Sequence, residues 1–354
     1  MKIEEKEIKF SFIIPVYNCG EYLNKFIREI EAVNLYNYEI ILVDDGSTDD
    51  SGNVCDKLAQ RSEKIYCIHQ KNQGVSSARN HGLQVATGDY VCFFDADDDI
   101  GSERLHALLR RIEKEKTVID IAVFGMAFDY YYKGKMYYRN EMITPLKGIQ
   151  GENVWLHRLE DLFHSNSLSS ACNKVFRREF LVEHELYLSK DMFIYEDLEY
   201  SLRCMAYCSN ILFEPKVIYY YRQSEDEGNA GRRLMRIEHI SDLVVRIEAA
   251  TNELKTRLDG ETQEITNILT SLYLVLAKEK IAVSNARQIK QICDDFANWF
   301  QNRQINIPSE SRNYLNLLVK HNVWRLILKK KYIYIRHKIA VTVKNTGMYK
   351  KLRG

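Results

Sequence analysis

Four aspartates follow a short apolar segment in the first third of the chain. The segment 90–94 is expected to be a buried strand, and Asp95, Asp97, Asp98 and Asp99 come directly after it. Carboxylates this close repel one another and lose hydration when they are partly buried. A hard divalent cation such as Mg²⁺ or Mn²⁺ would offset that cost, because it prefers oxygen ligands and leaves positions open for phosphate oxygens. The cluster therefore indicates a metal–diphosphate site.

A structural alternative needs no cation. In a solvated turn, Asp98 or Asp99 would cap a helix over residues 102–114. A calcium EF-hand fits less well, because Ile100 stands where that loop needs a glycine and His106 where it needs a glutamate. The residues upstream of the cluster favour the ligand site.

Two earlier apolar segments also end in polar turns. The first, from Phe10, leads into a turn in which Asn18 and Glu21 have the spacing of a capping box for the next helix. The second, 39–45, ends in two aspartates and is followed by Ser47 and Thr48. Carboxylates and hydroxyls at a helix N-terminus suit the exposed backbone N–H groups there, which also favour anions.

Strands and helices alternate strictly across the first 100 residues. A third strand is expected at 65–69, a polar turn at 72–74 and a helix through 78–80, before the strand that ends at the aspartates. Alternation of this kind predicts a mostly parallel sheet with helices on both faces, whose ligands bind at the carboxyl ends of the strands. All the candidate residues fall at those ends.

The four segments together resemble a known family. Residues 15–18, 43–49, 74–80 and 95–97 are similar, in order and spacing, to motifs of the family-two inverting glycosyltransferases of GT-A fold. The resemblance implies an α/β fold of GT-A type, with a doubly wound mixed sheet and a C-terminal helical appendage. It also implies a transferase that uses Mn²⁺ or Mg²⁺.

The resemblance implies a donor site built from all four motifs. The residues expected to bind the nucleotide sugar are Pro15, Tyr17, Asp45, Gly74, Arg79, Asp95 and Ala96, and Asp97 is expected to hold the metal on the diphosphate. A fixed carboxylate such as Asp45 can accept the imide N–H of uracil, whereas Asp44 points to the other side of its strand and has a structural role.

Two donor-site residues keep a second interpretation. Gly74 either lets a loop approach the nucleotide closely or is a plain turn glycine. Arg79 either pairs with a phosphate or with one of the aspartates, and the internal pair is favoured.

The acceptor chemistry is expected at Glu196 and Asp197, where an amphipathic helix with Leu198, Leu202 and Met205 on its apolar side begins. Acidic residues at a helix start are often only favoured by the helix dipole. The resemblance, however, implies that Asp197 is the general base and that Glu196 orients the acceptor or the base. Inversion requires one carboxylate to take the proton of the attacking hydroxyl.

Three further segments have open roles. Asn173 and Lys174 lie in a stretch that resembles the family and either line the site or pack beneath it. The polar loop 223–233 suits a lid over bound nucleotide, with an arginine among Arg222, Arg232 and Arg233 on the diphosphate. The tyrosine-rich segment 128–138 predicts a hairpin, in which cross-strand packing is favoured over stacking on a sugar.

Composition sets the organisation of the chain. With 354 residues, 45% of them hydrophobic, the chain accommodates a catalytic domain at 1–225 and a helical region at 226–354. Within the catalytic domain, residues 1–100 form the nucleotide-sugar half and residues 101–225 the acceptor half. The eight cysteines are scattered without paired metal-ligand spacing, as in a reduced cytoplasmic protein. Neither a secretory signal nor an apolar run of about 18 residues is found.

The end of the chain is strongly basic. Residues 311–354 contain twelve Lys and Arg and no Asp or Glu, whereas the other residues carry 38 basic and 49 acidic side chains. Aromatic and aliphatic residues are interleaved with these charges, a pattern typical of a segment on an anionic membrane surface. The alternative is a basic helix packed on the catalytic domain; no nucleic acid partner is expected. The predicted location is cytoplasmic, peripheral on the inner face of the cell membrane.

The sequence therefore predicts a metal-dependent inverting glycosyltransferase. It would move a hexose or N-acetylhexosamine from a nucleotide sugar, a UDP-sugar being expected, to a saccharide or lipid-linked acceptor in surface polysaccharide biosynthesis. The alternative is a non-catalytic GT-A-like scaffold or sugar-nucleotide-binding module at the membrane, although Asp45, Asp97 and Asp197 are all present. A nucleotidyltransferase is disfavoured because 16–20 lacks basic residues, and a Rossmann dehydrogenase is excluded because no Gly-x-Gly-x-x-Gly follows a strand.

Overall fold

The structure is a computed structural model that describes residues 7–132, 134–192, 194–224, 240–258, 263–301, 318 and 325–326. The chain forms two compact units, one of residues 1–228 with 249–264 and one of residues 229–248 with 265–354. The division at residue 225 stays a prediction. Of the lid predicted at 223–233, residues 225–233 lie outside the described residues, as does the basic tail apart from residues 318, 325 and 326.

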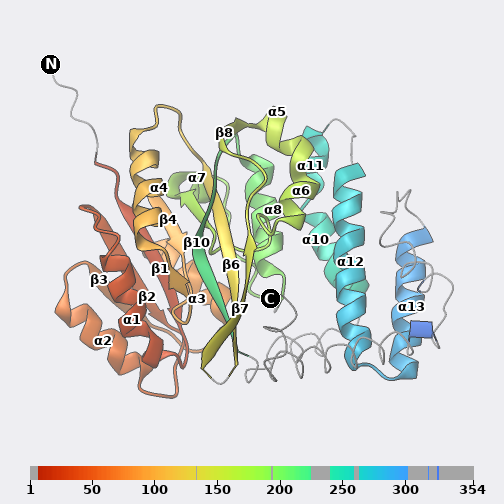
Figure 1. Cartoon of the computed structure of the whole chain (residues 1–354), viewed down its shortest axis with the longest axis horizontal. Coiled ribbons are helices and arrows are strands. Elements are labelled where there is room, and N and C mark those ends of the chain that lie inside the picture. Colours follow the sequence, from red (N-terminus) through yellow and green to blue (C-terminus); the bar gives the residue numbers. More distant parts are fainter. Residues whose placement is uncertain are drawn as a thin grey trace, which may run out of the picture. The chain divides into compact units, whose positions relative to one another are not determined.

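The first unit opens with the predicted alternation (Figure 1). The elements are β1 (Phe10–Val16), α1 (Gly20–Glu31), β2 (Tyr38–Asp44), α2 (Ser51–Arg61), β3 (Ile65–His69), α3 (Val75–Val85) and β4 (Tyr90–Phe93). The strands are parallel and lie in the order β3-β2-β1-β4. The carboxyl ends of all four strands therefore meet at one edge of the sheet.

The second half of the sheet is mixed, as predicted. Its strands are β5 (Asp99–Ile100), β6 (Ile121–Tyr132), β7 (Lys135–Met142), β8 (Gly148–Gly151), β9 (Lys174–Arg177) and β10 (Asn210–Ser224). Strand β9 runs antiparallel between β4 and β6, and β10 runs parallel to β6. The helices of this half are α4 (Ser102–Lys114), α5 (Glu152–Trp155), α6 (Leu159–His164), α7 (Arg178–Glu183) and α8 (Glu196–Tyr207), with a 3₁₀ turn at Leu156–Arg158.

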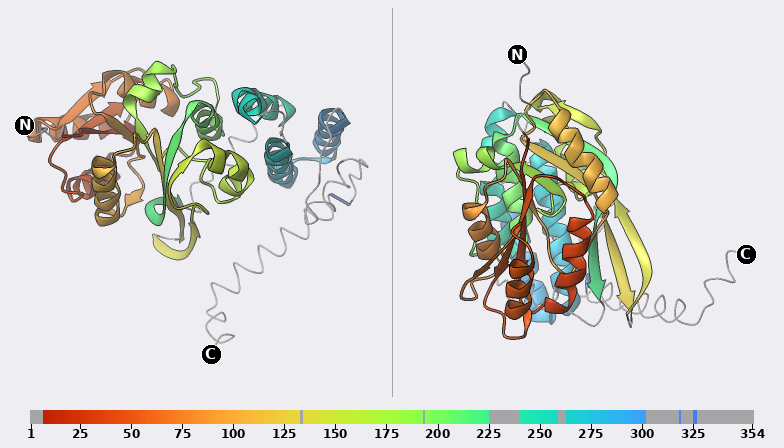
Figure 2. Two further views of the ribbon diagram at one scale, coloured as in Figure 1. Left: turned by 90° about the horizontal axis from the view of Figure 1, so that it is seen from above. Right: turned by 90° about the vertical axis from the view of Figure 1, so that its left-hand side faces the viewer.

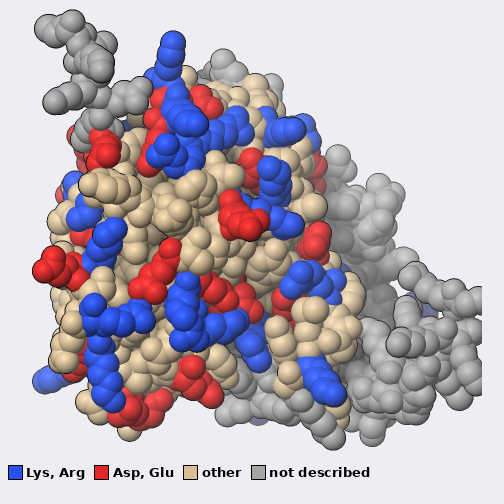
Figure 3. Space-filling model, turned by 60° about the vertical axis from the view of Figure 1, so that its left-hand side comes forward, with Lys and Arg blue, Asp and Glu red and all other residues tan. Residues whose placement is uncertain are grey.

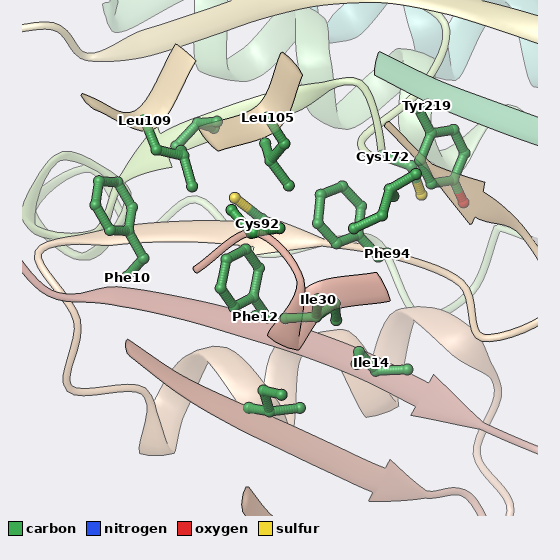
Figure 4. Close-up of a cluster of buried hydrophobic side chains, with 14 of the residues drawn as sticks. Phe10, Phe12, Ile14, Ile30, Cys92, Phe94, Leu105, Leu109, Cys172 and Tyr219 are labelled. Carbon is green, nitrogen blue, oxygen red and sulfur yellow. The ribbon is translucent and has the colours of Figure 1, made fainter. Parts of the chain in front are cut away.

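Helices lie on both sides of the sheet (Figure 2), because the buried strands are apolar on both faces. On one face, Phe12 and Phe94 stack at 6.0 Å within a cluster that includes residues of α1 and α4 (Figure 4). On the other face Ile13 points at α3, where a Cβ on Gly82 would lie 2.4 Å from its Cγ2. Burying each such large apolar side chain contributes roughly 1.5–3 kcal/mol to stability.

The tyrosine-rich hairpin forms as predicted. Strands β6 and β7 pair antiparallel around Gly134, which has a φ of 73°. The ring of Tyr130 packs across the hairpin on that of Tyr138 with 5.6 Å between centroids. Cross-strand packing, favoured from the sequence, is thus confirmed, although Tyr137 and Tyr138 remain about half exposed.

Helix α8, which begins at the predicted catalytic pair, is fixed at its far end. Arg257 of α11 (Asn252–Arg257) donates through Nη1 to the carbonyl oxygens of Met205, Ala206 and Cys208, at 3.2, 2.9 and 3.0 Å. A cation at these carbonyls also complements the helix dipole. Arg257, assigned to the C-terminal region from the sequence, therefore supports the helix that carries Asp197.

The second unit is helical, as predicted. It contains α10 (Ile240–Ala249) up to residue 248, α12 (Gln263–Val283) from residue 265 and α13 (Ala286–Gln301). Apolar side chains of α12 are buried, among them Ile265, Ile268, Leu269, Leu272 and Leu276. The ring of Tyr273 packs on Phe296 and Trp299 at 4.9 and 5.2 Å. Among the described helices, none is both long and apolar enough to cross a membrane.

Candidate functional site

The predicted donor residues gather at the edge where β1, β2, β3 and β4 end. Pro15 is the penultimate residue of β1, and Tyr17, which is half exposed, follows the strand. Asp45 follows β2, and Gly74 stands immediately before α3. The strand order, and not the sequence order, makes these residues neighbours, because β1 lies between β2 and β4.

Asp45 is held by neutral donors from one loop. Its Oδ1 accepts hydrogen bonds from Gln70 Nε2 and Gln73 N, and its Oδ2 from Gly74 N, all at 2.8 Å. Gly74 has a φ of 88°, which favours glycine, and a Cβ there would meet no heavy atom within 4 Å. Glycine is therefore required at residue 74 by the backbone conformation that presents its N–H to Asp45.

Asp44 points away from Asp45, as predicted, and has internal partners. Its Oδ2 contacts His69 Nδ1 at 2.8 Å, and its Oδ1 accepts from Ser47 N at 3.0 Å. Burial alone would raise the pKa of Asp44, but these hydrogen bonds outweigh it and lower the pKa. The hydrogen bonds of Asp44 and Asp56 raise the pKa of His69 to about 9.

The capping box expected at Asn18 and Glu21 is wrong. Asn18 has a φ of 51°, and its Oδ1 accepts from Thr48 N at 2.8 Å, so it supports the loop after β2. Ser51 Oγ caps α1 instead, because it accepts from Cys19 N and Gly20 N at 3.0 and 2.8 Å. A side chain from the next helix thus replaces a local cap.

The acidic cluster is compensated mainly by protein groups. Asp95 pairs with Arg79, and Asp98 accepts from the Tyr219 hydroxyl and from Arg222 N. Asp99 pairs with Lys25. These contacts do not test the predicted cation at Asp97. The alternative in which Asp98 or Asp99 caps the following helix is wrong, since Gly101 precedes α4 and no side chain caps it.

Asp97 and Asp98 differ in exposure. Asp98 is buried, and burial together with the charges of Asp97 and Asp95 raises its pKa well above the usual value. Asp97 is exposed, and Ala96 between it and Asp95 is buried. Within the cluster, the exposed carboxylate of Asp97 is the one that offers oxygen ligands to a hard cation from solvent.

Arg79 connects the two halves of the site. Its side chain is 3% exposed, and it donates through Nη2 to Asp95 at 2.8 Å and through Nη1 to Asp197 at 2.9 Å. The internal pairing favoured from the sequence is confirmed. Burial alone would lower the pKa of Arg79, but the two carboxylates outweigh it and raise the pKa. One guanidinium therefore fixes the predicted base beside the donor-site cluster.

Asp197 has a defined position at the start of α8. Its Oδ2 accepts from Ala171 N at 3.1 Å, while its Oδ1 is held by Arg79. Glu196 is the first residue of the helix and is partly exposed, and Tyr195 before it has a φ of 58°. The structure thus brings Asp197 to the donor residues, 118 residues away from Arg79 in sequence.

Lys174 and Asn173 lie beneath the site. Lys174 is fully buried, and its ammonium donates to the Ser170 carbonyl and to Asn173 Oδ1. Burial lowers the pKa of Lys174 to about 8, although the charge of Asp197 opposes that shift. Asn173 Nδ2 donates to the Phe124 carbonyl at 3.2 Å. Both side chains therefore have packing roles, one of the two alternatives left open by the sequence.

One group of candidate residues was missed from the sequence. Asp56, Cys67 and His69 lie together at β3 and α2, with one ligand atom of each within 4.8 Å of the others. The alternation of Cys67 and His69 on a strand could have indicated that they share a face. The spacing between cysteines gives no signal for a mixed set of one aspartate, one cysteine and one histidine.

Basic and acidic side chains are interspersed over the face drawn in Figure 3. A mixed surface of this kind does not create a field of one sign that would steer a charged ligand from a distance.

Comparison with known proteins identifies the fold and a matching family. Residues 11–184, just under half of the chain, match the family model described as glycosyl transferase family 2. This region is therefore similar to glycosyl transferase family 2. The fold is that of the GT-A glycosyltransferases, as expected: S. aureus TarS 1-349, in a structure with UDP-GlcNAc, aligns over 93% of this chain and 92% of that chain with a TM-score of 0.55 and 16% identity.

Two curated relatives belong to Bacillus subtilis. EpsH is 27% identical over 214 residues, which are 60% of this chain and 60% of EpsH. The minor teichoic acid biosynthesis protein GgaB is 37% identical over 122 residues, which are 34% of this chain and 14% of GgaB. The chain thus spans less than two thirds of the length of either relative.

Proposed function

We propose that the protein is a metal-dependent inverting glycosyltransferase, which transfers a hexose or N-acetylhexosamine from a UDP-sugar to a saccharide or lipid-linked acceptor. The observation that carries the proposal is the contact of Arg79 with both Asp95 and Asp197. An acid–base carboxylate is useful only where it reaches the reacting hydroxyl. Similarity to the family supports the reaction class, and this contact supports the assignment of Asp197 as the base.

Asp45 is proposed to recognise uracil by accepting a hydrogen bond from its imide N–H. An ionised carboxylate has about four acceptor positions. Three positions on Asp45 are used by Gln70, Gln73 and Gly74, so one on Oδ2 remains for the imide N–H of the base. Tyr17, exposed at the end of β1, would contact the base or ribose together with Pro15. UDP is also the nucleotide of the sugar donor named for the TarS structure.

Asp97 fits the metal that this reaction class uses. Its carboxylate is exposed and offers hard oxygen ligands, which suit Mn²⁺ or Mg²⁺ with positions left for phosphate oxygens. When bound there, the ion would neutralise the charge that develops on the leaving diphosphate. Asp95, oriented by Arg79, would face the donor sugar or ribose.

Asp197 is proposed to take the proton of the acceptor hydroxyl. Each of its oxygens accepts one hydrogen bond, from Arg79 and from Ala171 N, which leaves acceptor capacity on both. The acceptor oxygen would attack the anomeric carbon from the face opposite the diphosphate, with no covalent enzyme intermediate. Glu196 would orient the acceptor or the base.

The acceptor is proposed to belong to surface polysaccharide biosynthesis. The relative GgaB is named for minor teichoic acid biosynthesis, a pathway of this kind. The basic composition of residues 311–354 supports contact with an anionic membrane from the cytoplasmic side, where lipid-linked acceptors would be available.

The first experiment titrates purified protein with UDP, GDP and CDP, each with Mn²⁺ and with EDTA. We expect tight binding of UDP that requires the metal and is lost in Asp97→Ala. Asp161→Ala removes an exposed aspartate of α6 that pairs with nearby Arg158, and it serves as the control that keeps binding. Absence of binding to all three nucleotides would contradict the proposal. Binding without transfer to any acceptor would support the non-catalytic module instead.

A further inference from the structure

Three side chains of metal-ligating type converge outside the donor site. Asp56 extends from α2, and Cys67 and His69 from β3. His69 Nε2 lies 3.0 Å from Asp56 Oδ1 and 3.4 Å from Cys67 Sγ. A nitrogen, a sulfur and an oxygen donor thus face one another at the edge strand of the sheet.

The fold brings these residues together by simple means. Cys67 and His69 are two residues apart on a strand, so their side chains leave the same face. Helix α2 packs against that face, and Gly52 allows a close approach. A Cβ on Gly52 would lie 3.2 Å from Asp44 Oδ2 and 3.5 Å from His69 Cε1.

The spacing suits a tetrahedral ion. Bonds of about 2.0–2.3 Å at tetrahedral angles separate the ligand atoms of a zinc site by roughly 3.3–3.6 Å. The distances of 3.0 and 3.4 Å from His69 Nε2 are near that range, and all three ligand atoms lie within 4.8 Å of one another, so side-chain rotations can bring them to it. The side chains of Asp56 and His69 are 50% and 48% exposed, which leaves access for the ion and for a water molecule.

His69 is already oriented as a ligand. Its Nδ1 contacts buried Asp44 Oδ2 at 2.8 Å, and Asp44 is in turn held by Ser47 N. Metal-bound histidines commonly donate their second ring N–H to a carboxylate, which fixes the ring and directs the other nitrogen at the ion. Here Nε2 is directed at Asp56 and Cys67.

We propose that Asp56, Cys67 and His69 bind one Zn²⁺ ion, with water as the fourth ligand and Asp44 as the residue that positions His69. This site is separate from the hard-cation site proposed at Asp97, because thiolate and imidazole select softer ions than carboxylates alone.

An ion at this position would act on the donor site through one residue. Gln70 follows His69 directly, its N–H donates to the Asp44 carbonyl at 2.9 Å, and its Nε2 donates to Asp45 at 2.8 Å. Zinc would therefore hold the end of β3 and, with it, the loop that fixes Asp45. The proposed role is structural support of the nucleotide pocket.

The test uses the full-length protein stripped with a chelator and then titrated with Co²⁺ in excess Mg²⁺. Magnesium fills oxygen-ligand sites and does not compete for a thiolate. We expect one equivalent of Co²⁺ to give a thiolate-to-cobalt charge-transfer band, which Zn²⁺ then removes by displacement. Cys67→Ser should lose the band, and Asp44→Asn should weaken binding about 10- to 100-fold.

Two further variants keep the test decisive if Cys67→Ser or Asp44→Asn does not fold. Asp56→Asn changes a half-exposed side chain and should weaken Co²⁺ binding, whereas His164→Gln, an exposed histidine of α6 paired with Glu160, should not. Without a metal site, a protonated His69 would pair with Asp44 and Asp56 and no charge-transfer band would form. That result, a band that survives Cys67→Ser, or a Cys55–Cys67 disulfide in the purified protein would overturn the proposal.

Discussion

Asp45, proposed to bind the donor, and Asp197, proposed as the base, are held by different kinds of hydrogen-bond donor. Asp45 accepts three hydrogen bonds from uncharged donors of one nearby loop, residues 70–74. Asp197 depends on the buried guanidinium of Arg79, which also pairs with Asp95. Neutral donors orient a carboxylate without cancelling its charge, whereas a shared cation couples two carboxylates to each other. The donor side is thus a local arrangement, and the acceptor side depends on contacts distant in sequence.

The largest effect is expected for Asp197→Asn, which removes the base but keeps a side chain of similar shape. General base catalysis contributes about 10²–10⁴-fold, so kcat should fall by that factor while UDP binding is retained. Steady-state kinetics together with a nucleotide titration check both. Glu199→Gln is the matched control, because Glu199 lies on the same helix but pairs with Arg203 and Ser189. If Asp197→Asn weakened UDP binding as much as it lowered kcat, the proposed separation of donor binding from base catalysis would be contradicted.

The second-largest effect is expected when Arg79, the cation that pairs with both Asp95 and Asp197, is replaced. Arg79→Met leaves Asp95 and Asp197 without their partner, and breaking a buried ion pair in this way costs about 3–5 kcal/mol. Urea denaturation should show this loss of stability. Arg79→Lys keeps one charge but lacks the fork that reaches both carboxylates, so an intermediate loss is expected. A loss near zero for Arg79→Met would show that the two carboxylates do not depend on Arg79.

The burial of Lys174 on the acceptor side can be tested through the pH dependence of stability. Its pKa is about 8 in the folded protein and 10.5 as a free side chain. Between these values the unfolded chain still binds the proton that the native protein has released, so stability rises with pH across this window. The gain from Lys174, on the order of 3 kcal/mol, should be absent in Lys174→Met. Denaturation at pH 7.5 and 10 gives the change in the free energy of unfolding for each protein. An equal change in the two proteins would contradict a buried lysine at residue 174.

The smallest effect is expected on the donor side. Asp45→Asn presents an amide N–H₂ to groups that themselves donate, and losing hydrogen bonds to a charged acceptor costs roughly 1.5–3 kcal/mol. UDP should bind about 10- to 150-fold more weakly. Asp44→Asn is the control on the opposite side of the strand, with UDP binding measured at saturating Mn²⁺ and Zn²⁺. A larger effect for Asp44→Asn than for Asp45→Asn would reverse the roles assigned to the two residues.

The sequence predicted the strands and helices better than the side-chain contacts between them. The alternation of strands and helices over residues 10–100 follows from local apolar periodicity, and the sheet edge follows from that alternation. The cap on α1 was predicted wrongly, because Ser51 from the next helix accepts the N–H groups of Cys19 and Gly20, while Asn18 accepts from Thr48 N. Local spacing carries no information about such a tertiary contact.

The same limit applies within the site. The pairing of Arg79 with an aspartate was favoured, but its contact with Asp197 could not be inferred from motifs 118 residues apart. Asp56, Cys67 and His69 were missed because they come from two elements and mix three residue types. Carboxylates that looked costly as a group proved to have separate partners, since the fold supplies Lys25, Arg79 and Tyr219 from three distant segments.

The double contact of Arg79 also sets an order of events during synthesis. Asp95 is 16 residues from Arg79, whereas Asp197 is 118 residues away. At about 5–20 residues per second, a ribosome needs roughly 6–24 s to add those 118 residues. The ribosome can therefore add the residues of the nucleotide half, with the guanidinium of Arg79 paired only with Asp95, before Asp197, the carboxylate proposed as the base, has been made. We expect the second pairing to complete the enzyme at a late stage of its production.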